Sequence, residues 1–509
     1  MKGKWIIVIG SVLALLLIGS IGSFFFLSRI GVGNLNQGGM GSMMNSSNES
    51  SSDTMMGMEN GGMGHATNIK LKNSTEKENP LGLPKVLKPD QEDKESMRYT
   101  VVAREGTTRF FANGDQTNTL GYNGNYLGPM IELKKGKTVS IRTINQLGEP
   151  TTFHWHGLVV PSQVEGGPHQ IVNPGESKDV TFKVEQNEST LWFHPHPMGK
   201  TASQVYKGLA GLLYVKEVNL KTNLPQKYGK NDIPLILQDR QFNKENSMNY
   251  DDIEKSDGAL GDTLVVNGTL NPYFDVKYSQ IRVRLLNGSN ARNYVVKLSD
   301  GASFEKIAGD GGYLSKPEKV RSVALSPGER TEILLDFSKH SIGEQVSLIT
   351  DGVTITKFKL KEKQGRNSEI TNVIQKMPKL NDADLKPDRR LTLFGMGKMV
   401  EINGKTFDEN RIDIKVKQNR TETWEIYNKK DMMGGMIHPF HIHGVQFVVL
   451  ERNGVQTNSQ ERGLKDTVAV KPGERVKIRM TFKQKGVFMY HCHILEHEEN
   501  GMMGQLKVD

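Results

Sequence analysis

The last nineteen residues of the chain concentrate side chains that bind metals: His491, Cys492, His493, His497 and Met502. Because Cys492 is the only cysteine, it cannot form an internal disulfide and must serve packing, reactivity or metal binding. A thiolate, two imidazoles and a weak thioether are the donor set of a blue-copper electron-transfer site. Cys492, His497 and Met502 supply three of these donors. The fourth must come from another part of the chain.

The run before this cluster, residues 486–490, is apolar and aromatic, which is typical of a strand. Side chains alternate between the two faces of a strand. His491 and His493 therefore face one way, and Cys492 faces the other. One short segment then contacts two metal sites and joins them by covalent bonds, which suits electron transfer between two copper centres.

Three more histidine pairs have the same spacing, with one residue between the two imidazoles: His154 and His156, His194 and His196, His441 and His443. His438 precedes the last pair by three residues. These clusters contain ten of the thirteen histidines, so most of the histidine content is committed to one pattern.

Two alternatives compete with a copper site. A single pair of this kind is more simply an exposed or hydrogen-bonded pair of strand histidines, but four such pairs, one with cysteine and methionine, favour metal binding. Zinc is the next competitor. Closed structural zinc sites are four-coordinate and cysteine-rich, whereas this chain has one thiolate.

From about residue 98 to its end, the chain resembles the multicopper oxidase family, and is most similar to bacterial copper-efflux (cuprous) oxidases and bacterial laccases. Residues 153–158 and 438–444 carry the closest similarity. The resemblance implies four coppers per chain. It gives the type-1 copper to His438, Cys492 and His497, with Met502 as axial ligand. It gives the type-2 copper to His154 and His441. It gives the type-3 pair to His156, His194, His196, His443, His491 and His493.

The resemblance also implies the reaction: one-electron oxidation of a donor at the type-1 copper, and reduction of dioxygen to water at the three-copper cluster. Reduction to water needs protons, which carboxylates beside the cluster can carry. Glu498 follows His497, and Glu165 stands where the family usually has Asp. The alternative for both glutamates is an exposed, solvated carboxylate.

The electron donor is the open question. Asp431, Met432, Met433 and Met436 precede His438, and an Asp-Met segment near this position helps copper-efflux oxidases to bind substrate Cu(I). Here the segment is longer by two glycines, and packing near the copper is the alternative. We therefore expect a cuprous oxidase acting in copper tolerance, with phenols as further donors. A laccase-like phenol or amine oxidase and a non-enzymatic copper-binding protein are the other hypotheses.

The N-terminal part predicts attachment to a membrane. Residues 1–30 contain an apolar run from Trp5 to Leu27, about 34 Å as a helix, after two lysines. We expect an uncleaved anchor, with a cleaved signal peptide as the alternative. Residues 31–97 predict a flexible tether, in which seven methionines between residues 40 and 63 either capture copper or reflect biased composition.

The net charge of +9 is scattered, which argues against a nucleic-acid surface.

A repeat predicts the organisation of the rest. A Pro-Gly-Glu turn recurs at residues 174–176, 327–329 and 472–474, each time before a strand-like stretch. Short strands with frequent turns favour an all-β fold of three cupredoxin-like Greek-key β-sandwich domains in series, at residues 98–220, 230–363 and 385–509. The middle domain has no histidine cluster, so we expect the three-copper cluster between the other two, with the middle domain as a spacer. We expect a monomer with its catalytic domains outside the cytoplasm.

Overall fold

The computed structural model describes residues 69–217, 220, 222–365, 381–432, 434–458, 461 and 463–509. The predicted anchor, residues 1–30, and the first part of the tether, residues 31–68, lie outside these ranges. In the described ranges, no helix has the length and hydropathy needed to span a bilayer.

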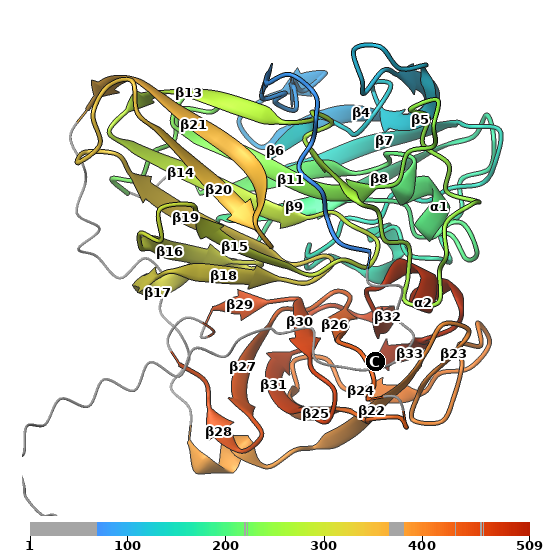
Figure 1. The fold of residues 1–509 in the computed structure, drawn as a ribbon. Helices are drawn as coiled ribbons and strands as arrows, with labels where there is room; N and C mark the ends of the chain where they lie inside the picture. The colour runs from blue at the N-terminus through green and yellow to red at the C-terminus, as the bar shows by residue number, and fades with distance from the viewer. Residues whose placement is uncertain are drawn as a thin grey trace, which may run out of the picture. The chain divides into compact units, whose positions relative to one another are not determined.

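The first sandwich is formed by a sheet ordered β2-β6-β10-β9 and a sheet ordered β3-β4-β7-β8, in which β5 also pairs with β4. Figure 1 labels its strands β4 to β9 in the blue-to-green part of the ribbon. Alternating apolar residues of both sheets, such as Val101 and Leu213, pack into one hydrophobic cluster. Its strands are β2 (Val86–Leu87), β3 (Gln91–Glu92), β4 (Ser96–Thr108), β5 (Thr117–Tyr122), β6 (Met130–Lys134), β7 (Thr138–Gln146), β8 (Ser177–Lys183), β9 (Ser189–Phe193) and β10 (Gly211–Lys216).

The middle sandwich pairs a sheet ordered β1-β13-β21-β20-β15-β18 with a sheet ordered β12-β11-β14-β19-β16-β17. Val283 and Phe358, one from each sheet, belong to its core. Its strands are β1 (Asn79–Pro80), β11 (Asp232–Arg240), β12 (Thr263–Val266), β13 (Pro272–Tyr278), β14 (Gln280–Asn287), β15 (Tyr294–Leu298), β16 (Phe304–Gly309), β17 (Gly312–Val320), β18 (Ser322–Leu325), β19 (Arg330–Asp336), β20 (Gln345–Thr350) and β21 (Val353–Gln364).

The third sandwich pairs a sheet ordered β23-β22-β25-β31-β27-β28, with β29 on β27, and a sheet ordered β24-β33-β32-β26-β30. Its core contains Trp424 from one sheet and Phe440 from the other. Its strands are β22 (Arg389–Met396), β23 (Met399–Ile402), β24 (Ile414–Val416), β25 (Thr421–Asn428), β26 (His438–Ile442), β27 (Phe447–Arg452), β28 (Val455–Gln456), β29 (Leu464–Lys465), β30 (Thr467–Val470), β31 (Arg475–Thr481), β32 (Gly486–Cys492) and β33 (Met503–Val508).

Helices are few in the described residues: α1 (Thr201–Tyr206), α2 (Leu495–Glu499) and the 3₁₀ turns η1 (Ser162–Val164) and η2 (Asp382–Leu385). Helix α2 joins β32 to β33, and these three elements lie together in the red, C-terminal part of Figure 1. The all-β fold class predicted from the sequence is confirmed.

Residues 69–97 differ from the predicted flexible tether. Strand β1 pairs in parallel with β13 of the middle sandwich. Glu78 forms ion pairs with Lys357 at 2.7 Å and Lys359 at 2.5 Å, and Lys72 pairs with Asp262 at 2.8 Å. The tether prediction is wrong for this stretch because its Lys- and Glu-rich composition, interpreted as that of a solvated linker, supplies ion pairs to a neighbouring sheet.

The three Pro-Gly turns take the same backbone conformation. Gly175, Gly328 and Gly473 have φ of +79°, +82° and +78°, values that L side chains rarely adopt. Their surroundings differ. A Cβ on Gly175 would meet no atom within 4 Å, whereas one on Gly328 would lie 2.9 Å from the ring of His493. The turn of the middle sandwich therefore packs directly against a predicted copper ligand.

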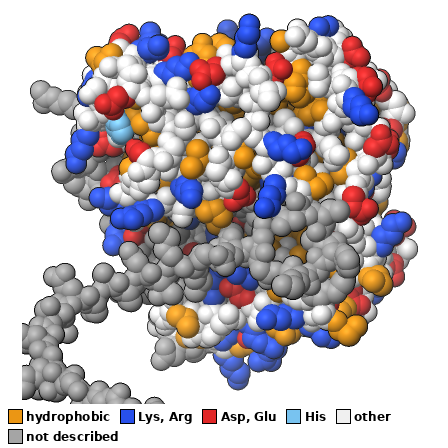
Figure 2. All heavy atoms as spheres, in the orientation of Figure 1, with side chains coloured by type: hydrophobic (Ala, Val, Ile, Leu, Met, Phe, Trp, Pro, Cys, Tyr) orange, Lys and Arg blue, Asp and Glu red, His pale blue; other side chains and the backbone are white. Residues whose placement is uncertain are grey.

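Charged side chains of both signs are interspersed over the face shown in Figure 2, without a continuous band of one sign among the coloured residues. This agrees with the scattered charge inferred from the sequence.

Candidate metal centre

The predicted type-1 ligands come together in the third sandwich. The Sγ of Cys492, at the end of β32, lies 3.5 Å from Nδ1 of His438 and 3.8 Å from Nδ1 of His497. His438 begins β26, and His497 is in α2. All three side chains are buried, and their donor atoms lie close enough to hold one metal ion.

Met502 is fixed to the same group by the main chain. The Cys492 N–H donates to the Met502 carbonyl at 3.0 Å, and the Met502 N–H donates to the His497 carbonyl at 2.9 Å. Cys492 and Met502 are fully buried in one hydrophobic cluster. These two main-chain hydrogen bonds thus close residues 492–502 into a compact loop.

Burial sets the protonation of these ligands. It lowers the pKa of His438 to about 4 and that of His497 well below its ordinary value, so both imidazoles are neutral at pH 7 and keep a lone pair. Burial also raises the pKa of the Cys492 thiol. A metal cation that binds here must replace the thiol proton, and a neutral-imidazole, thiolate and thioether set suits copper.

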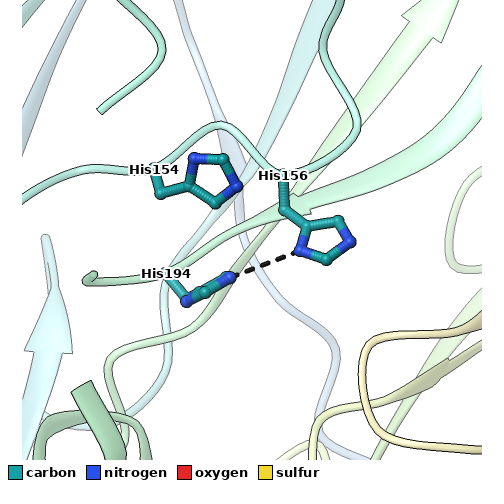
Figure 3. A group of neighbouring side chains, drawn as sticks. All are labelled: His154, His156 and His194. Carbon is teal, nitrogen blue, oxygen red and sulfur yellow. Dashed lines mark hydrogen bonds between the residues drawn. The ribbon is translucent and has the colours of Figure 1, made fainter. Parts of the chain in front are cut away.

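The other eight clustered histidines converge between the first and third sandwiches. They form overlapping groups able to hold metal ions: His154 with His156 and His194, His154 with His441 and His443, and His196 with His443 and His491. Figure 3 shows the first group, in which Nδ1 of His156 lies 3.4 Å from Nε2 of His194. His493 has its ring 5.0 Å from that of His156, centroid to centroid.

The ring nitrogens of these histidines fit metal cations. Nε2 of His491 lies 3.3 Å from Nε2 of His196 and 3.1 Å from Nε2 of His443. Burial lowers the pKa of all three rings, so neutral nitrogens with lone pairs face each other. Nε2 of His154 and both nitrogens of His493 have no hydrogen-bond partner among the described residues. Metal cations bound between these nitrogens would remove the repulsion between facing lone pairs and would give the unpartnered nitrogens a ligand.

Both predicted glutamates contact this cluster and are buried, so neither is a solvated surface carboxylate. Oε2 of Glu165 lies 2.9 Å from Nδ1 of His154 and 2.9 Å from Nδ1 of His443. The carboxylate oxygens of Glu498 lie 3.3 Å from Nδ1 of His196 and 3.3 Å from Nδ1 of His491. Burial raises the pKa of Glu498 well above its ordinary value.

Sequence reasoning missed a third carboxylate. Oδ1 of Asp466 lies 3.0 Å from Nε2 of His156, and its carbonyl oxygen lies 2.8 Å from Nδ1 of His441. Arg330, from the middle sandwich, forms an ion pair with Asp466. No local signal in the sequence marks either residue. Asp466 is more than twenty residues from the nearest histidine cluster, and Arg330 follows a Pro-Gly turn in the domain that has no histidine cluster.

The predicted donor segment lies beside the type-1 ligands in part. The charge of Asp431 acts on His438 and raises its pKa against the effect of burial. Met432 is fully exposed, and Met436 is partly buried against the core of the third sandwich. Met433 lies outside the described residues. Sequence reasoning also missed the β22–β23 hairpin, in which the main chain of Gly395 forms a hydrogen bond with the His438 side chain.

Comparisons with known proteins agree with this geometry. Two family models, both described as multicopper oxidase, match residues 102–219 and 374–509. A multicopper oxidase of Staphylococcus aureus is 47% identical over 437 residues, which cover 86% of this chain and 94% of that protein. The crystal structure of a multi-copper oxidase from Pediococcus acidilactici has a TM-score of 0.84 at 41% identity, covering 87% of this chain and 94% of its own.

The cell division protein FtsP of Escherichia coli (strain K12) is also similar, at 33% identity over 421 residues, which cover 78% of this chain and 87% of that protein. The chain belongs to the multicopper oxidase family. It is an oxidoreductase that uses oxygen, and as such it binds four coppers, which the buried histidine groups fit.

Proposed function

We propose that this enzyme oxidises Cu(I) outside the cytoplasm and contributes to copper tolerance, with phenols as secondary donors. Bound copper supplies the one-electron transfers and the reduction of dioxygen to water. The protein's own residues decide which donor reaches the type-1 site, how the ligands are held and how protons arrive.

We assign the ligands as follows. His438, Cys492, His497 and Met502 hold the type-1 copper, and the distances around Cys492 support this set. His154 and His441 hold the type-2 copper. The type-3 pair is held by His156, His194, His196, His443, His491 and His493, which supply the facing nitrogens described above.

The observation that carries the choice of Cu(I) is the segment before His438. It combines an exposed thioether, Met432, with a carboxylate, Asp431, whose charge acts on His438. A thioether is a soft ligand that favours Cu(I), and a carboxylate attracts any cation by its charge, whereas an outer-sphere phenol needs neither. Met436 supports the type-1 site by packing, and Met433 completes the proposed donor segment.

Glu498 and Glu165 handle protons in this proposal. Glu498 contacts one histidine from each ligand-bearing sandwich, and burial raises its pKa, which favours the protonated form that a proton carrier needs. Glu165 accepts hydrogen bonds from His154 and His443 and holds these rings in place.

In this proposal, the N-terminal residues determine where in the cell the enzyme is located. Residues 1–30 anchor the chain in the cell membrane, and the methionine-rich residues 40–63 raise the local concentration of Cu(I). Deleting residues 1–30 should move the enzyme from the membrane fraction to the soluble fraction without changing oxygen uptake per molecule. Recovery of the intact deletion variant in the membrane fraction would contradict the anchor.

Oxygen uptake with Cu(I) and with a phenol tests the donor. Replacing Met432, Met433 and Met436 together by Leu should lower the Cu(I) rate selectively, while the phenol rate changes little. Met198→Leu is the control, because Met198 is an exposed methionine of the first sandwich. Equal losses with both donors would favour the alternative, a laccase-like oxidase of phenols or amines. Copper binding without steady oxygen uptake would leave a non-enzymatic copper-binding protein.

A further inference from the structure

Asp466 holds two predicted copper ligands from opposite sandwiches, one with its side chain and one with its main chain. Its Oδ1 lies 3.0 Å from Nε2 of His156, and its carbonyl oxygen lies 2.8 Å from Nδ1 of His441. Carboxylate and carbonyl oxygens only accept hydrogen bonds, so both ring nitrogens must donate. The lone pair of His156 is then on Nδ1, and that of His441 is on Nε2.

Both of these free nitrogens belong to the three-copper cluster. Nδ1 of His156 faces Nε2 of His194 at 3.4 Å (Figure 3). Nε2 of His441 has no hydrogen-bond partner in the described part of the chain. Asp466 therefore selects opposite tautomers in two ligands, and in each case the selected tautomer leaves the lone pair available to a metal.

Arg330 of the middle sandwich fixes the carboxylate of Asp466. Nη1 donates to Oδ1 at 2.7 Å, and Nη2 donates to Oδ2, which gives a two-pronged pair with a defined orientation. Arg330 is itself held by the carbonyl oxygens of Gly328 at 2.8 Å and Thr190 at 3.1 Å. Asp466 and Arg330 are both fully buried, so removing the guanidinium leaves the buried Asp466 charge without its arginine partner.

The space for this ion pair depends on the glycine that follows His156. Gly157 has φ of +87°, and a Cβ there would lie 2.5 Å from Oδ2 of Asp466 and 2.8 Å from Nη2 of Arg330. The glycine of the His-Trp-His-Gly motif thus admits the Arg330–Asp466 pair beside the ligand.

Glu165 offers a comparison within the same cluster. It bonds His154 and His443 in a similar way, but in the described residues its ion pairs are with histidines and include no Arg or Lys. The guanidinium is therefore a specific addition to the Asp466 side of the cluster.

We propose that Arg330 is a positioning residue of the three-copper cluster, which acts through Asp466 to fix the ring orientation and tautomer of His156 and His441. The middle sandwich, which supplies no ligand, thereby contributes a charge to the metal centre. This inference rests on the four-copper centre of the family and does not depend on which donor the enzyme uses.

Arg330→Gln tests the proposal, with Arg284→Gln as the matched control. Arg284 is equally buried, forms an ion pair with Asp232, and bonds Thr190, the residue that also holds Arg330. Among the described residues, its side chain bonds Asp232, Thr190 and Glu332 and no copper-site histidine. Both variants should lower the thermal midpoint, because each leaves a buried carboxylate unpaired.

The metal readouts should separate the two variants. In Arg330→Gln, the type-2 copper should be lost to a chelator about 10–100-fold more readily, and its EPR signal should change, because a partner of the ligands is removed. The blue colour of the type-1 copper should remain. Arg284→Gln should retain copper as the wild type does. Arg330→Lys should restore part of the retention, since lysine keeps the charge but not the two-pronged geometry.

Two results would overturn the proposal: wild-type retention and EPR signal in Arg330→Gln, or the same copper loss in both arginine variants. If Arg330→Gln does not fold, Asp466→Asn decides in its place, since the amide keeps the shape and removes the charge. Retention of the type-2 copper by Asp466→Asn with an unchanged EPR signal would overturn the proposal. An unchanged ratio of Cu(I) to phenol oxidation in these variants keeps this test separate from that of the donor.

Discussion

The two metal centres of this enzyme are assembled in different ways. The proposed type-1 ligands all belong to the third sandwich, and three of them lie within eleven residues, from Cys492 to Met502. The proposed three-copper cluster takes histidines from the first and third sandwiches. Glu165 and Asp466 contact these histidines, and Arg330 forms an ion pair with Asp466. The type-1 centre should therefore tolerate changes at the domain interfaces, whereas the three-copper cluster should not.

The largest expected effect is that of Cys492→Ser. This substitution removes the thiolate and should abolish the blue colour and donor oxidation, while most of the copper at the histidine cluster remains bound. Absorption spectra, copper content and oxygen uptake of the purified protein measure these three properties. A variant that stays blue and active would refute the type-1 assignment, and loss of all four coppers would break the comparison.

Glu498→Gln should slow turnover by about 10²–10⁴-fold, the usual contribution of a positioned proton carrier. Glutamine fills the same space but cannot deliver a proton. Copper content, the blue colour and reduction of the type-1 copper by the donor should stay unchanged, which restricts the defect to the three-copper cluster. Stopped-flow reduction and oxygen uptake distinguish the two steps. A wild-type turnover rate would show that protons take another route.

Of the two metal centres, Gly328→Ala should affect only the cluster between the sandwiches. The new Cβ would press on the ring of His493, and the positive φ would cost about 1–2 kcal/mol. Gly175→Ala is the control, because it has the same backbone strain and no neighbour within 4 Å. Both variants should lose a similar amount of stability, but only Gly328→Ala should lose copper from the cluster. Equal copper content in the two would contradict the contact with His493.

The copper-free protein should lose stability as the pH falls below about 6.5. Burial lowers the pKa of nine site histidines, so the unfolded chain binds protons that the folded chain does not. Glu496, Glu498 and Glu499 have raised pKa values and act in the opposite direction, but they are fewer. Seven of these nine histidines belong to the proposed three-copper cluster. A thermal midpoint that stays constant from pH 8 to pH 5 would contradict this prediction.

Met502→Leu should have the smallest effect. Copper and colour should remain, because the axial thioether is a weak ligand, and the type-1 potential should rise since a donor that stabilises Cu(II) is lost. Redox titration measures the change, with Met503→Leu as the control. A shift in Met503→Leu but not in Met502→Leu would move the axial role by one residue.

The residues that the sequence grouped around Cys492 lie together in the structure, and so do the histidines of the more dispersed cluster. The opposite orientation of His491 and Cys492 follows from strand geometry, because both lie in β32; this strand ends at Cys492, and His493 comes directly after it. Asp466 and Arg330 were not predictable in the same way, because 136 residues separate them and only the packing of two sandwiches brings them together. Residues 69–97 were misjudged because composition alone cannot distinguish a solvated charge from one paired with a distant sheet.

The pairing of residues 69–81 with the middle sandwich has a mechanical consequence. A pull on the chain from its N-terminal side is resisted by the hydrogen bond from Arg292 to the Ile69 carbonyl, by the ion pairs of Lys72 and Glu78, and by the hydrogen bonds of β1. Glu78 forms ion pairs with two residues of one strand, β21, that lie two positions apart, Lys357 and Lys359. Tension from that end therefore acts on the middle sandwich, which carries no proposed copper ligand. It reaches the ligand-bearing strands only after the contacts of residues 69–81 with the middle sandwich have broken.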